Sequence, residues 1–153
     1  MKQYLYVFLF FLLNFSLFAQ SVDREIKQLS LLETKVNKTE KDIDEMLEIC
    51  KGIYALEPDL ILHYLGKIKL LIKEKNYYPA WVDYCYLVQH VYKMKGKLQE
   101  AEKIITEIYE QNIKEFDSEE EASIKFYLAV IAYNLGNIEH SQTIIEDVIR
   151  SSV

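Results

Sequence analysis

The stretch PAWVDYCYLVQHVYKMKGKLQEAEKIITEIYEQNIKEF, residues 79–116, decides the fold. Apolar residues recur at intervals of three and four in residues 81–92 and again in residues 98–108, which is the spacing of amphipathic helices. The two stripes are separated by Lys95-Gly96-Lys97. A glycine there fits a left-handed helix end, a conformation that costs other residues about 1 kcal/mol. The stretch therefore predicts two helices folded back on each other.

Both predicted helices have counterparts elsewhere in the chain. The apolar pattern of the first recurs earlier, in residues 43–56, at a shift of 38 in the numbering. The pattern of the second recurs at a shift of 40 in both directions, in residues 61–68 and in residues 138–148. Gly96 likewise recurs as Gly136. A fixed period of this length is the signature of a helical repeat.

The signals at helix ends place the remaining elements. Thr39 with Asp42, and Ser118 with Glu121, have the spacing of capping boxes. Pro58 suits the first turn of a helix. We expect successive helices over residues 22–36, 41–56, 58–75, 79–94, 98–116, 122–135 and 138–148, with Asn76 as the stop of the third.

Composition supports an all-α domain and disfavours nucleic acid as a partner. The chain has 153 residues, with only 4 Gly and 2 Pro, so helix breakers are rare. The net charge is -6, and an acidic surface repels phosphate backbones. The one basic run, residues 93–97, lies at a predicted helix end, where cations complement the helix dipole.

The N-terminus resembles a secretory signal peptide in its order of charged, apolar and small residues. Lys2 precedes an apolar run over residues 4–18, and small residues follow. That run is shorter than the roughly 20 apolar residues that span a membrane. We predict a signal peptide over residues 1–19, cleaved after Ala19 or Ser21, and one exported domain over residues 22–153. The alternative is a membrane anchor formed by residues 4–18, which would be the chain's only membrane contact.

If the protein is exported, its two cysteines can be either free thiols or a disulfide. Cys50 and Cys85 both lie on predicted apolar helix faces, where a thiol serves as a small hydrophobic group. Oxidising compartments allow a disulfide between them, but the sequence cannot show that they meet. We expect free thiols, and their spacing argues against a metal site.

The pattern Tyr92, Gly96, Ala101, Ile105 and Ile108 resembles the tetratricopeptide repeat. That family places a Tyr, a Gly, an Ala and two apolar residues at these spacings, and the resemblance covers roughly residues 40–150. A looser second copy follows at Tyr133, Gly136, Ser141, Ile145 and Val148. The period is longer than the usual one of about 34 residues, and in this the chain is similar to longer-helix variants. The resemblance implies a short right-handed superhelix of antiparallel helix hairpins, about three units long.

The same resemblance implies a binding groove on the first helix of each hairpin. Carried over position by position, it consists of Asp83, Tyr86, His90 and Lys93, followed by Ser123, Phe126, Val130, Tyr133 and Asn134. Family members hold extended peptides or partner helices there. The basic cluster by which some of them clamp a C-terminal carboxylate is absent from these positions. The alternative is that these residues are ordinary surface and packing between repeats.

No motif in the chain indicates an enzyme. The histidines His63, His90 and His140 fall on three different predicted helices, and no nucleophile elbow, phosphate loop or zinc motif is present. We therefore expect no catalytic residue, cofactor or metal.

Three functions remain open from the sequence. The first is an exported scaffold that binds a protein or peptide in the bacterial envelope. The second is the sensory input region, or a truncated relative, of a membrane-bound signalling regulator or kinase. The third is a structural protein that self-associates through its last helix, making homo-oligomers.

Overall fold

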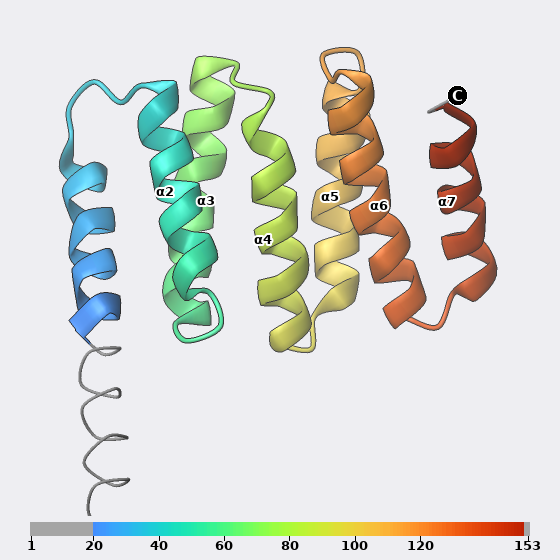
Figure 1. Ribbon diagram of the computed structural model, residues 1–153, viewed down its shortest axis with the longest axis horizontal. Helices are drawn as coiled ribbons and strands as arrows, with labels where there is room; N and C mark the ends of the chain where they lie inside the picture. The colour runs from blue at the N-terminus through green and yellow to red at the C-terminus, as the bar shows by residue number, and fades with distance from the viewer. Residues whose placement is uncertain (1–19, 152–153) are drawn as a thin grey trace, which may run out of the picture. The chain divides into compact units, whose positions relative to one another are not determined.

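The computed structural model describes residues 20–151, and over that range it contains helices and turns but no strand (Figure 1). The expectation of an all-α protein is therefore confirmed. The chain divides into two compact units, one that ends at Lys38 and one that begins at Thr39. The signal-peptide prediction falls on residues 1–19, outside the described residues. The expectation of one domain over residues 22–153 stays a prediction.

The first unit contributes one described helix, over residues 20–34. Lys38 follows it and folds back, because its Nζ donates to the carbonyl oxygens of Glu33 at 2.7 Å and of Lys35 at 2.9 Å. A cation is favoured there by the unpaired carbonyl groups of the last turn. Of the predicted stripe, Leu29 is buried, while Val36 lies beyond the helix and is 83% exposed.

The described part of the second unit contains six helices joined by short turns. They are α2 (Glu40–Ile53), α3 (Pro58–Lys75), α4 (Ala80–Met94), α5 (Leu98–Asn112), α6 (Ser118–Asn134) and α7 (Ile138–Ser151). The predicted bounds of the third helix agree with α3 at both ends. The second and fifth predicted helices end a few residues beyond α2 and α5, and α6 begins at Ser118 rather than at residue 122.

At the starts of α2 and α6, side chains form capping hydrogen bonds with backbone N–H groups. At α2 the predicted capping box is present, since the backbone N–H of Thr39 donates to the Asp42 carboxylate at 2.7 Å. At α6 the predicted box of Ser118 and Glu121 is wrong by one residue. Asp117 caps the helix and accepts from the N–H of Glu120 at 2.8 Å, while the N–H of Asp117 donates to the Glu120 carboxylate. The Asp117 carboxylate is charged and therefore interacts favourably with the positive end of the helix dipole, and its use as the cap leaves Glu121 for other contacts.

The turns after α4 and α6 are alike, as the repeat period predicts. Gly96 and Gly136 have positive φ angles of 68° and 86°. In each turn the N–H of the residue after the glycine bonds back into the helix, from Lys97 to Tyr92 and from Asn137 to Ala132, both at 2.9 Å. This is the Schellman motif, which needs a left-handed residue. The end of α3 uses the same pattern with Asn76 in that position, so its prediction as a stop is confirmed.

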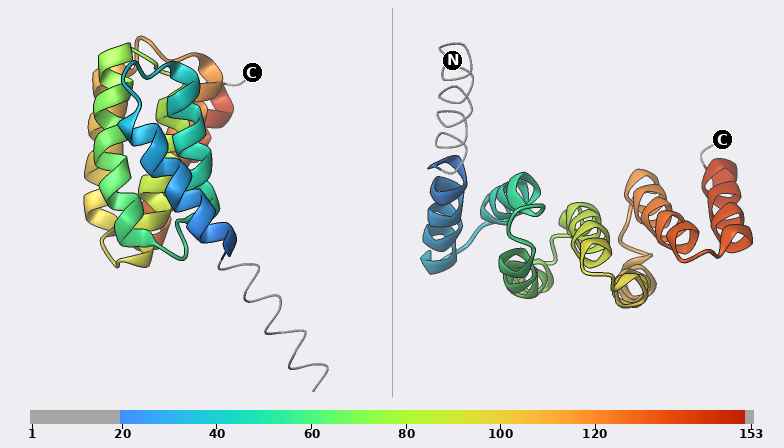
Figure 2. Two further views of the ribbon diagram at one scale, coloured as in Figure 1. Left: turned by 90° about the vertical axis from the view of Figure 1, so that its left-hand side faces the viewer. Right: turned by 90° about the horizontal axis from the view of Figure 1, so that it is seen from below.

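The six helices are arranged so that alternate helices share a side. Each helix packs on its neighbours in the chain, and α4 also contacts both α2 and α6. Among these described helices, no such contact joins α3 to α5 or α5 to α7. The right-hand view of Figure 2 shows α2 and α6 on one side and α3 and α5 on the other, with α4 between. The helices α2, α4 and α6 therefore form one layer.

Burial confirms the predicted register between α2 and α4. All six buried residues of α2, shifted by 38, fall on buried residues of α4: Asp42, Ile43, Met46, Leu47, Cys50 and Ile53 correspond to Ala80, Trp81, Tyr84, Cys85, Val88 and Val91. The edges of the predicted faces are wrong, since Leu56 and Met94 are about half exposed. Both lie at helix ends, beyond the reach of the neighbouring helix.

The last helix buries much less than its predecessor in the repeat. Ala101, Ile105 and Ile108 of α5 are buried, but of their α7 counterparts only Ser141 is. Its Oγ donates to the carbonyl oxygen of Ala129 at 2.8 Å. The small residues Ala101 and Ser141 thus lie where helices cross closely, as predicted.

Both cysteines are buried and unbridged. Burial raises the pKa of the Cys50 thiol to about 12 and also raises that of Cys85, so both stay protonated at neutral pH. Among the described residues, no helix is both long enough and apolar enough to cross a membrane.

Candidate functional site

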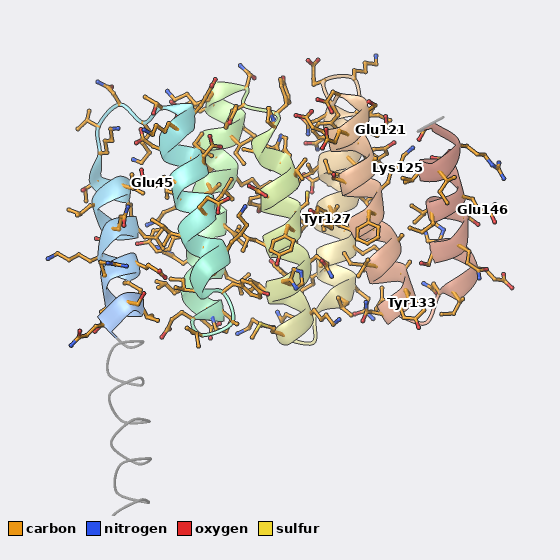
Figure 3. All side chains as sticks on the ribbon, viewed as in Figure 1. Glu45, Glu121, Lys125, Tyr127, Tyr133 and Glu146 are labelled. Carbon is orange, nitrogen blue, oxygen red and sulfur yellow. The ribbon has the colours of Figure 1, made fainter. Side chains whose placement is uncertain are left out.

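The layer of α2, α4 and α6 carries a continuous patch of aromatic side chains. Tyr86 lies at its centre, with its ring centroid 4.3 Å from that of His90, 6.3 Å from Tyr54 and 6.1 Å from Tyr127. Phe126 continues the row 6.3 Å beyond Tyr127. We call these five residues the aromatic patch. Figure 3 shows Tyr127 in the space between α4 and α6.

The helical periodicity explains why these rings meet. Tyr86 and His90 are four positions apart and therefore share one face of α4. Tyr54 reaches this face from the end of α2, with its ring centroid 5.4 Å from that of His90. The aromatic contacts thus run between the helices that form the layer. Tyr54, Tyr86 and Tyr127 are each partly exposed, and Phe126 is 50% exposed.

A small ionic group borders the aromatic patch. Lys51 of α2 donates to the Asp83 carboxylate of α4 at 2.9 Å and also pairs with Glu48. Burial opposes the charge of Lys51, but its hydrogen bonds to Glu48 and Asp83 outweigh that effect and raise its pKa. The Lys51 ammonium thus pairs with two carboxylates, those of Glu48 and Asp83, beside the tyrosines.

The pKa shifts in the aromatic patch favour its uncharged form. A hydrogen bond with Tyr54, together with burial, raises the pKa of Tyr86, and burial raises the pKa of Tyr127. Burial lowers the pKa of His90, and the nearby Lys93 ammonium lowers it further. The histidine is therefore neutral at pH 7, and the patch presents rings with polar edges.

The structure brings together part of the predicted set. Asp83, Tyr86 and His90 belong to the patch or its border, and Phe126 continues it. Lys93 is exposed near His90. Tyr133 is 62% exposed at the end of α6, and the amide of Asn134 donates to its own helix at Val130, so neither joins the aromatic contacts among the described residues.

The predicted set lacks two residues of the aromatic patch, Tyr54 and Tyr127, and one residue of the ionic group that borders it, Lys51. The groove that the resemblance implies covers only residues 83–93 and 123–134, so it omits α2. The apolar pattern places Tyr54 on the hidden face of its helix instead. Tyr127 is the repeat counterpart of Leu87, which is fully buried, and the register alone would therefore place it in the core.

A cavity of about 570 Å³ lies elsewhere, between α5, α6 and α7. None of the predicted site residues lines it. Its walls include Tyr109 and Glu110 of α5, Lys125 and Leu128 of α6, and Ile144 and Asp147 of α7. Cavities of this volume accommodate small organic molecules. No motif in the sequence points to it.

A polar cluster of Tyr109, Glu121, Lys125 and Asp147 borders this cavity. The Lys125 ammonium lies 2.8 Å from the Glu121 carboxylate and 2.5 Å from that of Asp147, and the Tyr109 hydroxyl donates to Glu121 at 2.8 Å. Figure 3 shows Lys125 between α6 and α7. The hydrogen bond to Asp147, followed by that to Glu121, raises the pKa of Lys125. Hydrogen bonds from Lys125 and Tyr109 lower the pKa of Glu121, and Lys125 lowers the pKa of Asp147.

The described residues contain no group of three or more His, Cys, Asp or Glu side chains placed to hold a metal ion. Comparisons of the chain with protein-family models, with curated proteins and with solved structures found no match. The candidate sites therefore rest on geometry alone.

Proposed function

We propose that this protein is an exported helical-repeat scaffold that binds a protein or peptide partner on the aromatic patch. The observation that carries the proposal is the row of partly exposed rings that crosses three helices, with Tyr86 at its centre. Aromatic side chains provide large contact areas at little cost in conformational entropy, and they are enriched where partners bind. The tetratricopeptide-like repeat, its right-handed superhelix and the signal peptide belong to this proposal.

The spacing of the rings favours an extended peptide. Successive centroids are 6.3 and 6.1 Å apart from Tyr54 through Tyr86 to Tyr127. Two residues of an extended chain advance about 6.2–6.8 Å, so alternate side chains of such a peptide meet successive rings. Because each ring comes from a different helix, the peptide would run across the helix axes.

The test compares two variants in the same binding assay. A phage-displayed library of random peptides is selected on the full-length chain, and enriched peptides are titrated against Tyr86→Ala/Tyr127→Ala. We expect at least about tenfold weaker binding, because two central rings are removed. Leu70→Ala is the control, since Leu70 is 68% exposed on α3, outside the layer.

Equal binding by the double variant, with both variants folded by circular dichroism, would place peptide capture outside the aromatic patch. Enrichment of no peptide above background would contradict the proposal itself. The loss of binding by Leu70→Ala as well would indicate a nonspecific apolar surface.

A second candidate function is self-association through α7. Ile138 is 44% exposed and Ile149 is 59% exposed on this helix, of which only Ser141 is buried. A second copy that covered these side chains would remove apolar surface from water. Sedimentation over a hundredfold range of concentration tests this, and a constant monomer mass would eliminate it. The sensory-input alternative has no specific observation in its favour.

A further inference from the structure

Helix α6 departs from the repeat along one stripe that the two earlier helices of its layer keep apolar. Trp81, Cys85 and Val88 of α4 are fully buried, and their repeat counterparts in α2 are the buried Ile43, Leu47 and Cys50. Their counterparts in α6 are Glu121, Lys125 and Leu128, all only partly buried. The register itself is intact, since Tyr84 and Val91 correspond to Ile124 and Ile131, which are all buried.

The polar stripe of α6 lies beside the cavity. The stripe of α4 faces the space between α3 and α5, where the Trp81 side chain is 1% exposed and a smaller opening of about 270 Å³ remains beside it. The stripe of α6 faces the equivalent space between α5 and α7, and there Lys125 and Leu128 line the opening of about 570 Å³. Both helices contact the helix before and the helix after them in the chain, but α4 also contacts α2 and α6, whereas the further contact of α6 among the described helices is with α4 alone.

The charges around the cavity are unequal. Three carboxylates line it, from Glu110, Glu146 and Asp147, and that of Glu121 accepts from the lining Tyr109 hydroxyl. The lining cations are Lys125 and Arg150, and His140 lines the cavity as well. Lys125 is already shared between Glu121 and Asp147, and Arg150 pairs with Glu146 at 3.2 Å. Both of these cations are thus engaged, and an anionic ligand would have to displace a carboxylate. A cationic ligand would instead correct the excess of negative charge.

The walls also offer apolar contact. Leu128 and Ile144 lie on facing helices, and Tyr109 lines the same space. The Lys125 ammonium lies 5.8 Å from the centre of the Tyr109 ring, within the range in which aromatic rings attract cations. We propose that this cavity is a second binding site, separate from the aromatic patch, for a short aliphatic chain that carries ammonium groups.

The experiment uses three four-carbon molecules that differ only in their end groups. The full-length chain is titrated by calorimetry with 1,4-diaminobutane, with 1,4-butanediol and with succinate. We expect saturable binding of the diamine only, weakened by added salt because the attraction is between charges. A blocked Gly-Lys-Gly peptide is titrated in parallel. Binding of the diamine alone identifies a free amine as the ligand, and binding of the peptide alone identifies a lysine side chain presented by a protein.

Two variants tie the binding to the cavity. Glu121→Trp/Lys125→Ala restores an apolar stripe like that of α4, fills the space and should abolish diamine binding in a folded protein. Asp147→Asn keeps the shape but leaves Lys125 with one carboxylate, and should weaken binding about threefold to tenfold. Tyr86→Ala should leave it unchanged, which separates this site from the peptide-binding proposal.

Preferential binding of succinate, or unchanged diamine binding by Glu121→Trp/Lys125→Ala, would overturn the proposal. So would the absence of binding of both the diamine and the peptide at millimolar concentration.

Discussion

Helices α4 and α6 occupy equivalent places in the repeat, yet they stabilise the fold by different means. In α4 the stripe of Trp81, Cys85 and Val88 is fully buried and packs apolar atoms against its neighbours. In α6 the stripe begins with Glu121 and Lys125, which reach Tyr109 and Asp147 through hydrogen bonds and ion pairs. Apolar burial stabilises a fold in proportion to its area, whereas partly exposed ion pairs contribute about 1 kcal/mol or less. A shared helix register therefore does not fix what a helix packs with.

The largest effect should come from emptying the packed stripe. Trp81→Ala removes the largest fully buried side chain among the described residues, and we expect a loss of about 3–5 kcal/mol in the free energy of unfolding. Leu128→Ala is the matched change in α6, and its cost should be smaller because Leu128 is only partly buried beside an existing cavity. Urea unfolding measures both. Equal losses of unfolding free energy in the two variants would mean that the surroundings of Trp81 and Leu128 are packed alike.

The turns that follow α4 and α6 should lose the same amount of stability when their glycines are replaced. Gly96→Ala and Gly136→Ala each force a residue with a side chain into a left-handed conformation, at a cost of about 1 kcal/mol. An added Cβ would meet no atom within 4 Å at either position, so backbone strain is the main expected cost. Thermal unfolding of the two variants should give the same shift. A clear difference would show that one of the turns is not held in the Schellman motif.

The smallest effect is the acid sensitivity of the polar cluster. Lys125 and Tyr109 hold the pKa of Glu121 below its ordinary value of 4.5, and Lys125 holds the pKa of Asp147 below 3.8. Carboxyl groups with lowered folded-state pKa values stabilise above the unfolded pKa, and this stabilisation is lost as the pH falls through the folded pKa. Lys125→Ala should therefore flatten the dependence of unfolding free energy on pH below about 4.5. If unfolding free energy depended on pH with the same slope in Lys125→Ala and in the unmodified protein, the polar cluster would not contribute to the pH dependence of stability.

Several features of the fold could be predicted from the sequence because they depend on neighbours within a few residues. The bounds of α3, the glycine turns and the box at Thr39 follow from Pro58, Gly96, Gly136 and Asp42. The buried register of α2 and α4 was also predictable, since apolar spacing reports which face of a helix is hidden. The cap of α6 was misplaced by one residue, because two adjacent side chains there both carry suitable oxygen acceptors.

The candidate sites were predictable only in part. Asp83, Tyr86 and His90 were predicted from the groove that the resemblance implies, and the spacing of three and four residues then places them on one helix face. Lys51 and Tyr54 could not be predicted, because they approach from α2, which the implied groove omits. Tyr127 could not, because its repeat counterpart Leu87 is a core residue. The sequence around Glu121 indicated a capping box with Ser118, and it gave no sign of the contacts with α5 and α7.

The helices, several of their ends and their repeat period could be predicted from the sequence alone, because they depend on local backbone chemistry and on the spacing of apolar residues. Folding in three dimensions was needed to settle which rings form the aromatic patch, and to join Lys125 to carboxylates from α6 and α7 beside a cavity. The physical reason is that contacts between helices depend on how side chains fill the space between them, and a repeat period does not specify that filling.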